Sequence, residues 1–362
     1  MIERAVLVAV QFDRERGGWP LADEVRELEE LARSSGCTVE DVIQVRPDRP
    51  NAPILIGSGK LEEIHDRVHS LRAQVVIFNR ELSPIQQRNI ENVLGVKTID
   101  RTQLILDIFA SRATSQEGKV QVELAQTRYL LPRLTGKGVM LSRLGGGIGT
   151  RGPGETKLEV DRRRIRQRIA RLTRELEKLS ERRHAAREHR RDMRVPVVAL
   201  IGYTNAGKST LLNRLTRAGA RAENRLFTTL DPLARRLRMP SGHEIILTDT
   251  VGFLHHLPHH LIEAFKATLE EAQDANLLLH VLDAAHPMAP QHAEAVAEVL
   301  EMLSLAHKPL ITVLNKLDAI DDIGRIQELS RLLPNPVAIS ALDGQGIDGL
   351  LAAIEQRLNQ QA

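Results

Sequence analysis

Residues 202–210 read GYTNAGKST, and this stretch decides the fold of the second half of the chain. It fits the pattern G-x-x-x-x-G-K-[ST] of a phosphate-binding loop, in which backbone N–H groups and a lysine surround nucleotide phosphates. An apolar, β-branched run at residues 195–201 precedes the loop, and residues 209–217 continue with helical periodicity. Strand, loop and helix thus follow in the order that a nucleotide triphosphate site requires. The alternative is a glycine-rich turn before an ordinary helix.

Each part of this loop has a chemical role in such a site. Gly202 and Gly207 let backbone N–H groups turn toward the β-phosphate, and Lys208 bridges the β- and γ-phosphates. The Ser209 hydroxyl is the first candidate ligand for Mg²⁺. We expect the whole loop to line the nucleotide site: Gly202, Tyr203, Thr204, Asn205, Ala206, Gly207, Lys208, Ser209 and Thr210.

Two further segments carry groups that respond to the γ-phosphate. A short strand run at residues 245–247 leads to Asp249, which can hold Mg²⁺ through water, and to Gly252, whose N–H can meet the γ-phosphate. Between the phosphate-binding loop and this strand run lies Thr229, the candidate second hydroxyl on Mg²⁺, ordered only while the γ-phosphate is present. The predicted binding residues here are Phe227, Thr228, Thr229, Leu230, Asp231, Asp249, Thr250, Val251 and Gly252, and the predicted catalytic residues are Lys208, Thr229 and Gly252.

The last two segments predict which base is bound. A strand run at residues 310–314 leads to Asp318, whose carboxylate can accept two parallel hydrogen bonds from guanine N1–H and N2–H₂. Adenine lacks this donor pair, so the sequence predicts GTP and GDP as ligands. A second run at residues 337–339 opens onto a backbone N–H that can reach the guanine carbonyl oxygen. The predicted contacts are Asn315, Lys316, Leu317, Asp318, Ser340, Ala341 and Leu342.

These motifs, within residues 195–358, resemble the translation-factor-like GTPase domain. GGGIGTRGPG at residues 145–154, running into the basic ETKLEVDRRRI, resembles the HflX family of ribosome-associated GTPases, as do LHHLPHHL at 254–261 and FKATL at 265–269. The resemblance covers nearly the whole chain. It implies that the GTP form binds the large ribosomal subunit against ribosomal RNA near the peptidyl transferase region, separates stalled ribosomes under stress and leaves after hydrolysis. Many members carry a further small domain after the GTPase core, and this sequence ends at Ala362.

Composition indicates a cytoplasmic protein of more than one domain. The chain has 362 residues, 42% of them hydrophobic, and its single cysteine, Cys37, excludes a disulfide framework or a thiolate cluster. No segment approaches the length of a membrane span, so only a peripheral association with a membrane is left open. Aromatic residues make up 2%, which disfavours stacking on unpaired bases. We expect a monomer that does not bind DNA.

A basic helical hairpin is predicted between the two α/β regions. The apolar positions Ile165, Ile169, Leu172, Leu176 and Leu179 form the seam of a long helix, with residues 119–134 as its antiparallel partner and residues 135–154 as a glycine-rich tip. Residues 151–194 contain sixteen Lys or Arg and eight Asp or Glu, whereas the whole chain carries +3. A solvated coiled-coil arm is the plain alternative, and the charge together with the glycine tip favours RNA.

The first part of the chain predicts a small α/β domain. Its strand-like and helix-like runs alternate at residues 5–10, 21–34, 38–45, 61–72, 75–79, 84–94 and 101–113. GSGK at residues 57–60 suggests a second nucleotide site, but the first glycine of a full phosphate loop is missing and Leu61 stands where a hydroxyl is needed. A tight turn opening a helix is the alternative. We therefore predict three parts: an N-terminal α/β domain (1–115), an antiparallel helical hairpin (116–194) and a Ras-like GTPase domain with a mostly parallel sheet (195–362).

Several residues bear on turnover. Phe253 stands where related enzymes orient the attacking water with glutamine, so basal hydrolysis is expected to be slow. Asn205 either helps to hold K⁺ beside the phosphates or only tightens the loop, and the ribosome is the other source of activation. The histidines at 255, 256, 259 and 260 are an improbable metal site because Pro258 interrupts any helix through them, and His280 is expected in the core. Two other functions stay open: a nucleotide-driven RNA remodeller, and a regulatory GTPase with a protein partner and no RNA.

Overall fold

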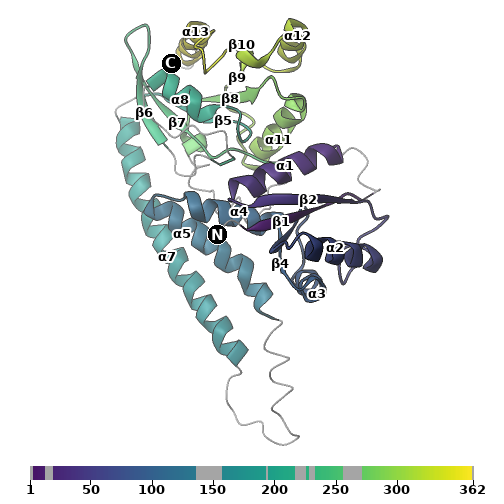
Figure 1. Cartoon of the computed structure of the whole chain (residues 1–362). Helices are drawn as coiled ribbons and strands as arrows, with labels where there is room; N and C mark the ends of the chain where they lie inside the picture. Colours follow the sequence, from purple (N-terminus) through teal and green to yellow (C-terminus); the bar gives the residue numbers. More distant parts are fainter. Residues whose placement is uncertain are drawn as a thin grey trace, which may run out of the picture. The chain divides into compact units, whose positions relative to one another are not determined.

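The computed structural model of the chain describes residues 3–12, 19–135, 157–192, 195–216, 226–227, 233–255 and 271–360 (Figure 1). The predicted site residues Thr228, Thr229, Leu230 and Asp231 and the glycine-rich tip lie outside the described residues. Two compact units are present: residues Met1–Ser111 with Val120–Leu176, and Arg112–Lys119 with Glu177–Ala362. The domain boundaries predicted from the sequence, at residues 115 and 194, stay a prediction.

A parallel four-stranded sheet forms the centre of the N-terminal region. Its order is β2-β1-β3-β4, and every neighbouring pair is parallel. The strands run through short apolar segments, and β1 is buried at all but its first residue. Because both faces of a parallel sheet are covered by helices, such strands read as continuous apolar runs. The strands are β1 (Arg4–Val10), β2 (Thr38–Val45), β3 (Val75–Phe78) and β4 (Lys97–Asp100).

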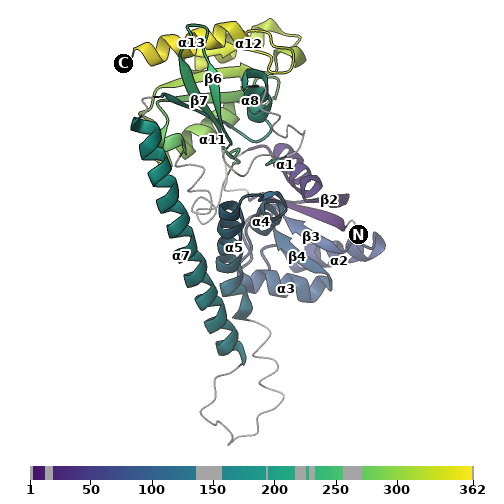
Figure 2. The same ribbon diagram turned by 90° about the vertical axis from the view of Figure 1, so that its left-hand side faces the viewer.

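Helices cover both faces of this sheet. Residues of α2 and α3 pack with Val6, Val8 and Val10 in one apolar cluster, and α1 lies on the opposite face (Figure 2). The ends of α3 follow from its flanking residues: Ser83 forms a capping box with Gln86, and Gly95 ends the helix in the left-handed conformation at φ 69°. The helices are α1 (Leu21–Ser34), α2 (Ser58–Ser70), α3 (Pro84–Leu94) and α4 (Arg101–Arg112).

The predicted helical pair follows α4. Helix α5 (Gln116–Leu130) continues into the 3₁₀ segment η1 (Leu131–Thr135), and α7 (Lys157–Asp192) returns beside α5 in both views (Figure 1 and Figure 2). Within the seam Leu172 is buried, and the guanidinium of Arg168 donates to the carboxylate of Glu123 across the pair at 2.6 Å. None of the helices in the described ranges has the length and apolar character that crossing a membrane requires.

The second sheet confirms the prediction of a mostly parallel Ras-like core. Its order is β10-β9-β8-β5-β7-β6, and only β6 is antiparallel to its neighbour. The five parallel strands place their carboxyl ends along one edge, where open α/β sheets bind ligands. The strands are β5 (Val197–Ile201), β6 (Leu233–Arg238), β7 (Glu244–Asp249), β8 (Leu277–Asp283), β9 (Leu310–Asn315) and β10 (Pro336–Ala338).

In the described part of the chain, two helices pack on each face of the second sheet. Helices α8 (Lys208–Thr216) and α13 (Ile347–Asn359) pack in one apolar cluster with alternate residues of β5, β7, β8 and β9. Helices α11 (Ala289–Met302) and α12 (Ile323–Leu332) pack on the other face around Leu282 and Leu314. The short 3₁₀ turn η2 (Leu317–Ala319) follows β9 directly.

Candidate nucleotide site

The glycines of the phosphate-binding loop lie where no side chain fits. A Cβ atom added to Gly202, at φ 147°, would lie 2.2 Å from the carbonyl oxygen of Val281 on β8. At Gly207, with φ 97°, it would lie 2.2 Å from Nδ2 of Asn315. Both glycines therefore allow the loop to approach the neighbouring strands closely, in a backbone conformation that other residues rarely adopt. The loop joins β5 to α8, as the sequence predicts.

The Lys208 ammonium is buried beneath the loop. Nζ donates hydrogen bonds to the carbonyl oxygens of Gly202 at 3.0 Å and Tyr203 at 2.8 Å. Burial lowers the pKa of Lys208 to about 8, and Asp249 acts in the opposite direction. The side chain is thus a charge held at the centre of the loop, where a phosphate would restore its usual pKa.

A hydroxyl and a carboxylate meet beside the loop. Ser209 Oγ donates to Oδ2 of Asp249 at 2.7 Å, and Asp249 is fully buried at the end of β7. Thr250 is fixed by a 2.7 Å hydrogen bond from Oγ1 to the carbonyl oxygen of Leu200. Hydroxyl and carboxylate oxygens are the hard ligands that Mg²⁺ prefers, so Ser209 and Asp249 fit the predicted metal site. Thr229, the third predicted ligand, lies outside the described residues.

The segment after Asp249 lies against the loop. The Phe253 N–H donates to the carbonyl oxygen of Gly202 at 3.0 Å, and the Thr204 N–H donates to the carbonyl oxygen of Phe253 at 2.9 Å. A Cβ at Gly252 would lie 2.8 Å from Cα of Thr204 and 3.1 Å from Nζ of Lys208. The ring of Phe253 is buried, as is the neighbouring Val251. The position at which a glutamine side chain would orient the attacking water is thus occupied by the buried, apolar ring of Phe253.

Asn315 ties two loops of the site together. Its Nδ2 donates to the carbonyl oxygen of Ala206 at 2.8 Å, and its Oδ1 accepts from the N–H of Ala341 at 2.9 Å. The side chain is 2% exposed, so water has no access to these groups. Sequence reasoning placed Asn315 in the guanine-binding set and missed this connection between the phosphate loop and the loop after β10.

Asp318 and Ser340 form the predicted guanine-binding edge. Ser340 Oγ donates to Oδ1 of Asp318 at 2.5 Å and accepts from the N–H of Asp343 at 3.0 Å. Lys316 adopts the left-handed conformation at φ 67°, and its ammonium contacts the Asp283 carboxylate at 2.7 Å. Leu342 is 64% exposed. The structure thus brings together the predicted residues that follow β9 and β10, and it adds Asp283, which ends β8 at the same edge of the sheet.

Three rings from distant parts of the chain stack behind the loop. Tyr203 lies parallel to His292 with ring centroids 4.0 Å apart, and His286 stacks on His292 at 4.5 Å. The Tyr203 hydroxyl accepts from the N–H of His255 at 2.9 Å. Burial, with smaller effects of His286 and His255, lowers the pKa of His292 to about 3, so this ring stays neutral. No sequence pattern indicates this stack, because its members are far apart in the chain.

The histidines do not assemble into a metal site in the part of the chain that the structure describes. No group of three or more His, Cys, Asp or Glu side chains with metal-binding geometry occurs there, and His256, His259 and His260 lie outside it. His280 is 5% exposed within β8, which confirms its expected place in the core. Phe227, at φ 57°, is also buried, and the rest of its predicted segment lies outside the described residues.

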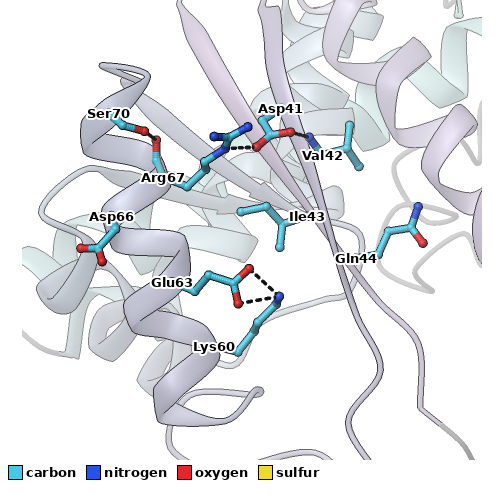
Figure 3. A pocket seen from close by; sticks show the side chains of 9 residues that line it. All are labelled: Asp41, Val42, Ile43, Gln44, Lys60, Glu63, Asp66, Arg67 and Ser70. Carbon is cyan, nitrogen blue, oxygen red and sulfur yellow. Dashed lines mark hydrogen bonds and ion pairs between the residues drawn. The ribbon is translucent and has the colours of Figure 1, made fainter.

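A pocket of about 660 Å³ lies between β2 and α2 in the N-terminal sheet (Figure 3). Its cations already have acidic partners: both carboxylate oxygens of Glu63 accept from the Lys60 ammonium at 2.7 Å, and Asp41 accepts from Arg67 at 2.5 Å. The GSGK segment is the start of α2, with Gly57 as its N-cap. The sequence alternative of a tight turn opening a helix is therefore confirmed, and these charge pairs disfavour phosphate binding.

Comparison with known proteins was made over the whole chain. The family models described as "GTP-binding GTPase N-terminal", "GTP-binding GTPase Middle Region" and "50S ribosome-binding GTPase" match residues 22–110, 112–190 and 197–316. The protein named "GTPase HflX" from Lacrimispora saccharolytica is 50% identical over 99% of this chain and 84% of its own length. The one from Caldanaerobacter subterraneus subsp. tengcongensis is 51% identical over 98% and 81%. The crystal structure of the SsGBP and GDP complex, 26% identical, covers 99% of both chains with a TM-score of 0.53.

Proposed function

Because the chain belongs to the GTPase HflX family and is a GTP hydrolase, we propose that its GTP form binds the large ribosomal subunit and separates or rescues stalled ribosomes under stress. Hydrolysis then releases the protein. The observation that carries this proposal is the match of residues 197–316 to the model described as "50S ribosome-binding GTPase", in a chain that also contains a basic helical pair. Ribosomal RNA near the peptidyl transferase region would receive the glycine-rich tip.

In this proposal the nucleotide site works as follows. The loop N–H groups and Lys208 hold the β- and γ-phosphates, and the Gly252 N–H meets the γ-phosphate. Ser209 and Thr229, with Asp249 through water, would hold Mg²⁺, which supplies charge neutralisation between the phosphates. Asp318, fixed by Ser340 at 2.5 Å, accepts from guanine and so selects GTP over ATP.

Slow basal turnover follows from the residues beside the γ-phosphate. Phe253 is 3% exposed and has no polar side-chain atom that could orient water. Asn205 adopts the left-handed conformation at φ 60°, which Asn tolerates better than most residues. It would either tighten the loop or help to hold K⁺ beside the phosphates. The ribosome is the other candidate source of the missing positioning group.

The charge that would meet RNA lies along α7. Its exposed residues include Arg164, Arg171 and Arg174, whose spacing of three to seven places them along one side of the helix. Arg168, by contrast, is engaged with Glu123 on the neighbouring helix. Arginine forks match phosphate geometry, and A-form RNA is recognised through its backbone and shape. Exposed arginines also occur on the other faces of α7, at Arg163 and Arg166, so the helix presents positive charge around much of its circumference.

Cosedimentation with purified large ribosomal subunits tests the proposal directly. The full chain is mixed with subunits in a non-hydrolysable GTP analogue or in GDP, at two salt concentrations. We expect binding in the analogue, weaker binding in GDP and a steep loss of binding at the higher salt. Equal binding in both nucleotides would refute the switch, and no binding in either would refute the ribosomal partner.

A charge-removal variant distinguishes RNA from a protein partner. Replacing Arg162, Arg163 and Arg164 with Gln should weaken subunit binding and flatten its salt dependence by up to about three units. A control with Gln at the exposed Arg46, Arg49 and Arg331 removes the same charge elsewhere. An unchanged profile in the first variant would favour a regulatory GTPase with a protein partner, and RNA strand separation that requires hydrolysis would favour the remodeller.

A further inference from the structure

Among the residues that the structure describes, strand β6 is an edge of the GTPase sheet, and its exposed side chains are all arginines. It pairs with β7 alone, in antiparallel register from Leu233–Asp249 to Arg238–Glu244. Leu237 is buried and Leu233 packs against the same apolar cluster, so the strand is anchored to the core. Arg235, Arg236 and Arg238 are exposed. Three of the four residues from Arg235 to Arg238, on the strand labelled β6 in Figure 2, therefore carry an exposed positive charge.

Little in the neighbourhood neutralises these charges. Arg236 approaches Glu244 at 3.4 Å, but both side chains are more than half exposed, so water screens the pair. Arg235 donates to the carbonyl oxygen of Ala234 on its own strand at 2.9 Å. Arg238 makes no hydrogen bond or ion pair with any residue that the structure describes. The strand therefore keeps an excess of positive charge that an anionic partner could meet.

Edge protection accounts for only part of this pattern. A single charge or a short strand is enough to discourage pairing with another sheet edge. Here Arg236 and Arg238 lie on one side of the strand, and Arg235 lies on the other side. The rise of a β-strand separates the Cα atoms of Arg236 and Arg238 by about 6.8 Å. Guanidinium groups spaced in this way can engage successive phosphates of one polynucleotide strand, each through two parallel N–H donors.

The surface fits a nucleic acid better than a protein. Protein interfaces are built around buried aromatic or aliphatic anchors surrounded by a polar rim. On β6 Leu237 is buried, Leu233 and Ala234 are half-buried, and the fully exposed side chains are all arginines. Phosphate recognition needs no apolar anchor, because charge and counterion release supply the affinity.

We propose that β6 is a second RNA-binding surface, which contacts the phosphate backbone of RNA through Arg235, Arg236 and Arg238. The identity of that RNA as ribosomal rests on the function proposed above. The strand begins shortly after the predicted γ-phosphate sensor Thr229, and its partner β7 ends at Asp249, the predicted Mg²⁺ ligand.

The test measures the salt dependence of binding for three full-length proteins. These are the wild type, the β6 variant with Gln at Arg235, Arg236 and Arg238, and the control with Gln at Arg46, Arg49 and Arg331. Each is titrated, with a non-hydrolysable GTP analogue, against large ribosomal subunits and separately against a protein-free RNA duplex. Fluorescent GDP binding confirms that the nucleotide site is intact. We expect the slope of log affinity against log salt to fall by about two to three units in the β6 variant alone.

Each other outcome has a definite meaning. A slope unchanged in the β6 variant, while the wild type binds subunits, overturns this inference and leaves the proposed function standing. An equal change in the control variant shows that net charge, not β6, is responsible, and also overturns it. A change with subunits but not with the RNA duplex assigns β6 to a ribosomal protein instead of RNA. If the wild type binds neither subunits nor duplex, the proposed function and the β6 contact both fail.

Discussion

Asn315 provides the most direct test of the site geometry. Replacing it with Ala removes two hydrogen bonds, at 2.8 Å to the Ala206 carbonyl and at 2.9 Å from the Ala341 N–H, in a position that is 2% exposed. Each buried backbone group left without a partner costs about 1–3 kcal/mol, so the two together cost about 2–6 kcal/mol. These bonds join the phosphate loop to the guanine loop. We therefore expect the free energy of unfolding to fall by about that amount, and GDP affinity to fall more than about threefold because the two loops are no longer held in place relative to each other.

The assay is a fluorescence titration with labelled GDP, accompanied by thermal denaturation without nucleotide. Asn335→Gly is the matched control, since Asn335 also donates from Nδ2 to a backbone carbonyl, that of Leu310 at 2.9 Å, but is exposed. Glycine accepts its left-handed backbone at φ 47° without strain. Affinity of the Asn315→Ala variant within threefold of the wild type would refute the bridging role. A loss equal to that of the control would do so too.

Three further outcomes follow from individual groups. GDP affinity should be constant below pH 8 and fall about tenfold per pH unit above it, because free Lys208 has a pKa of about 8 and must take up a proton to bind phosphate. GTP hydrolysis should slow when NaCl replaces KCl, and Asn205→Ala should remove the difference. The contribution of His280 to the free energy of unfolding should fall by about 2 kcal/mol from pH 7 to pH 5, because burial, and then Lys208, lower the pKa of His280 to about 4, whereas the unfolded chain takes up that proton near pH 6.5.

Contrary results are equally definite. A GDP affinity that is flat from pH 7 to pH 9 would contradict the buried, partly neutral Lys208. Identical rates in the two salts would remove K⁺ from the scheme and leave Asn205 as a loop-tightening residue. For His280, the pH-dependent loss should shrink in a His280→Leu variant when measured by urea denaturation. If the loss persists undiminished, other groups cause it.

Most of the fold could be predicted because the spacing of apolar residues and the residues typical of helix ends indicated the same elements. The strand at Thr38–Val45 and the helices Leu21–Ser34 and Pro84–Leu94 have the bounds that the sequence indicates. Two strands escaped prediction. Lys97–Asp100 has only four residues, too few to show a period, and Leu233–Arg238 shows arginines where an alternating apolar pattern is expected. As the sheet edge, the second of these needs few buried side chains.

The candidate site was predictable where motifs fix chemistry to position. Lys208, Asp249 and Asp318 each lie at or a few residues after the end of a strand, so a short local motif identifies each of them. The parallel sheet then brings these strand ends together. Contacts between segments that are distant in the chain are not indicated by any motif. The pairing of Lys316 with Asp283 and the stacking of Tyr203 on His292 depend on the crossing of loops in space, which no single-sequence pattern encodes.

The bridge between Phe253 and the phosphate loop has a mechanical consequence. Phe253 supplies both the donor to Gly202 and the acceptor for Thr204, from the two peptide groups that flank it, so a displacement of this residue lengthens both bonds at once. Any movement of the chain at Phe253 therefore loosens the phosphate-binding loop at two neighbouring residues, and a substitution that repositions Phe253 disturbs the loop without changing the loop's own sequence.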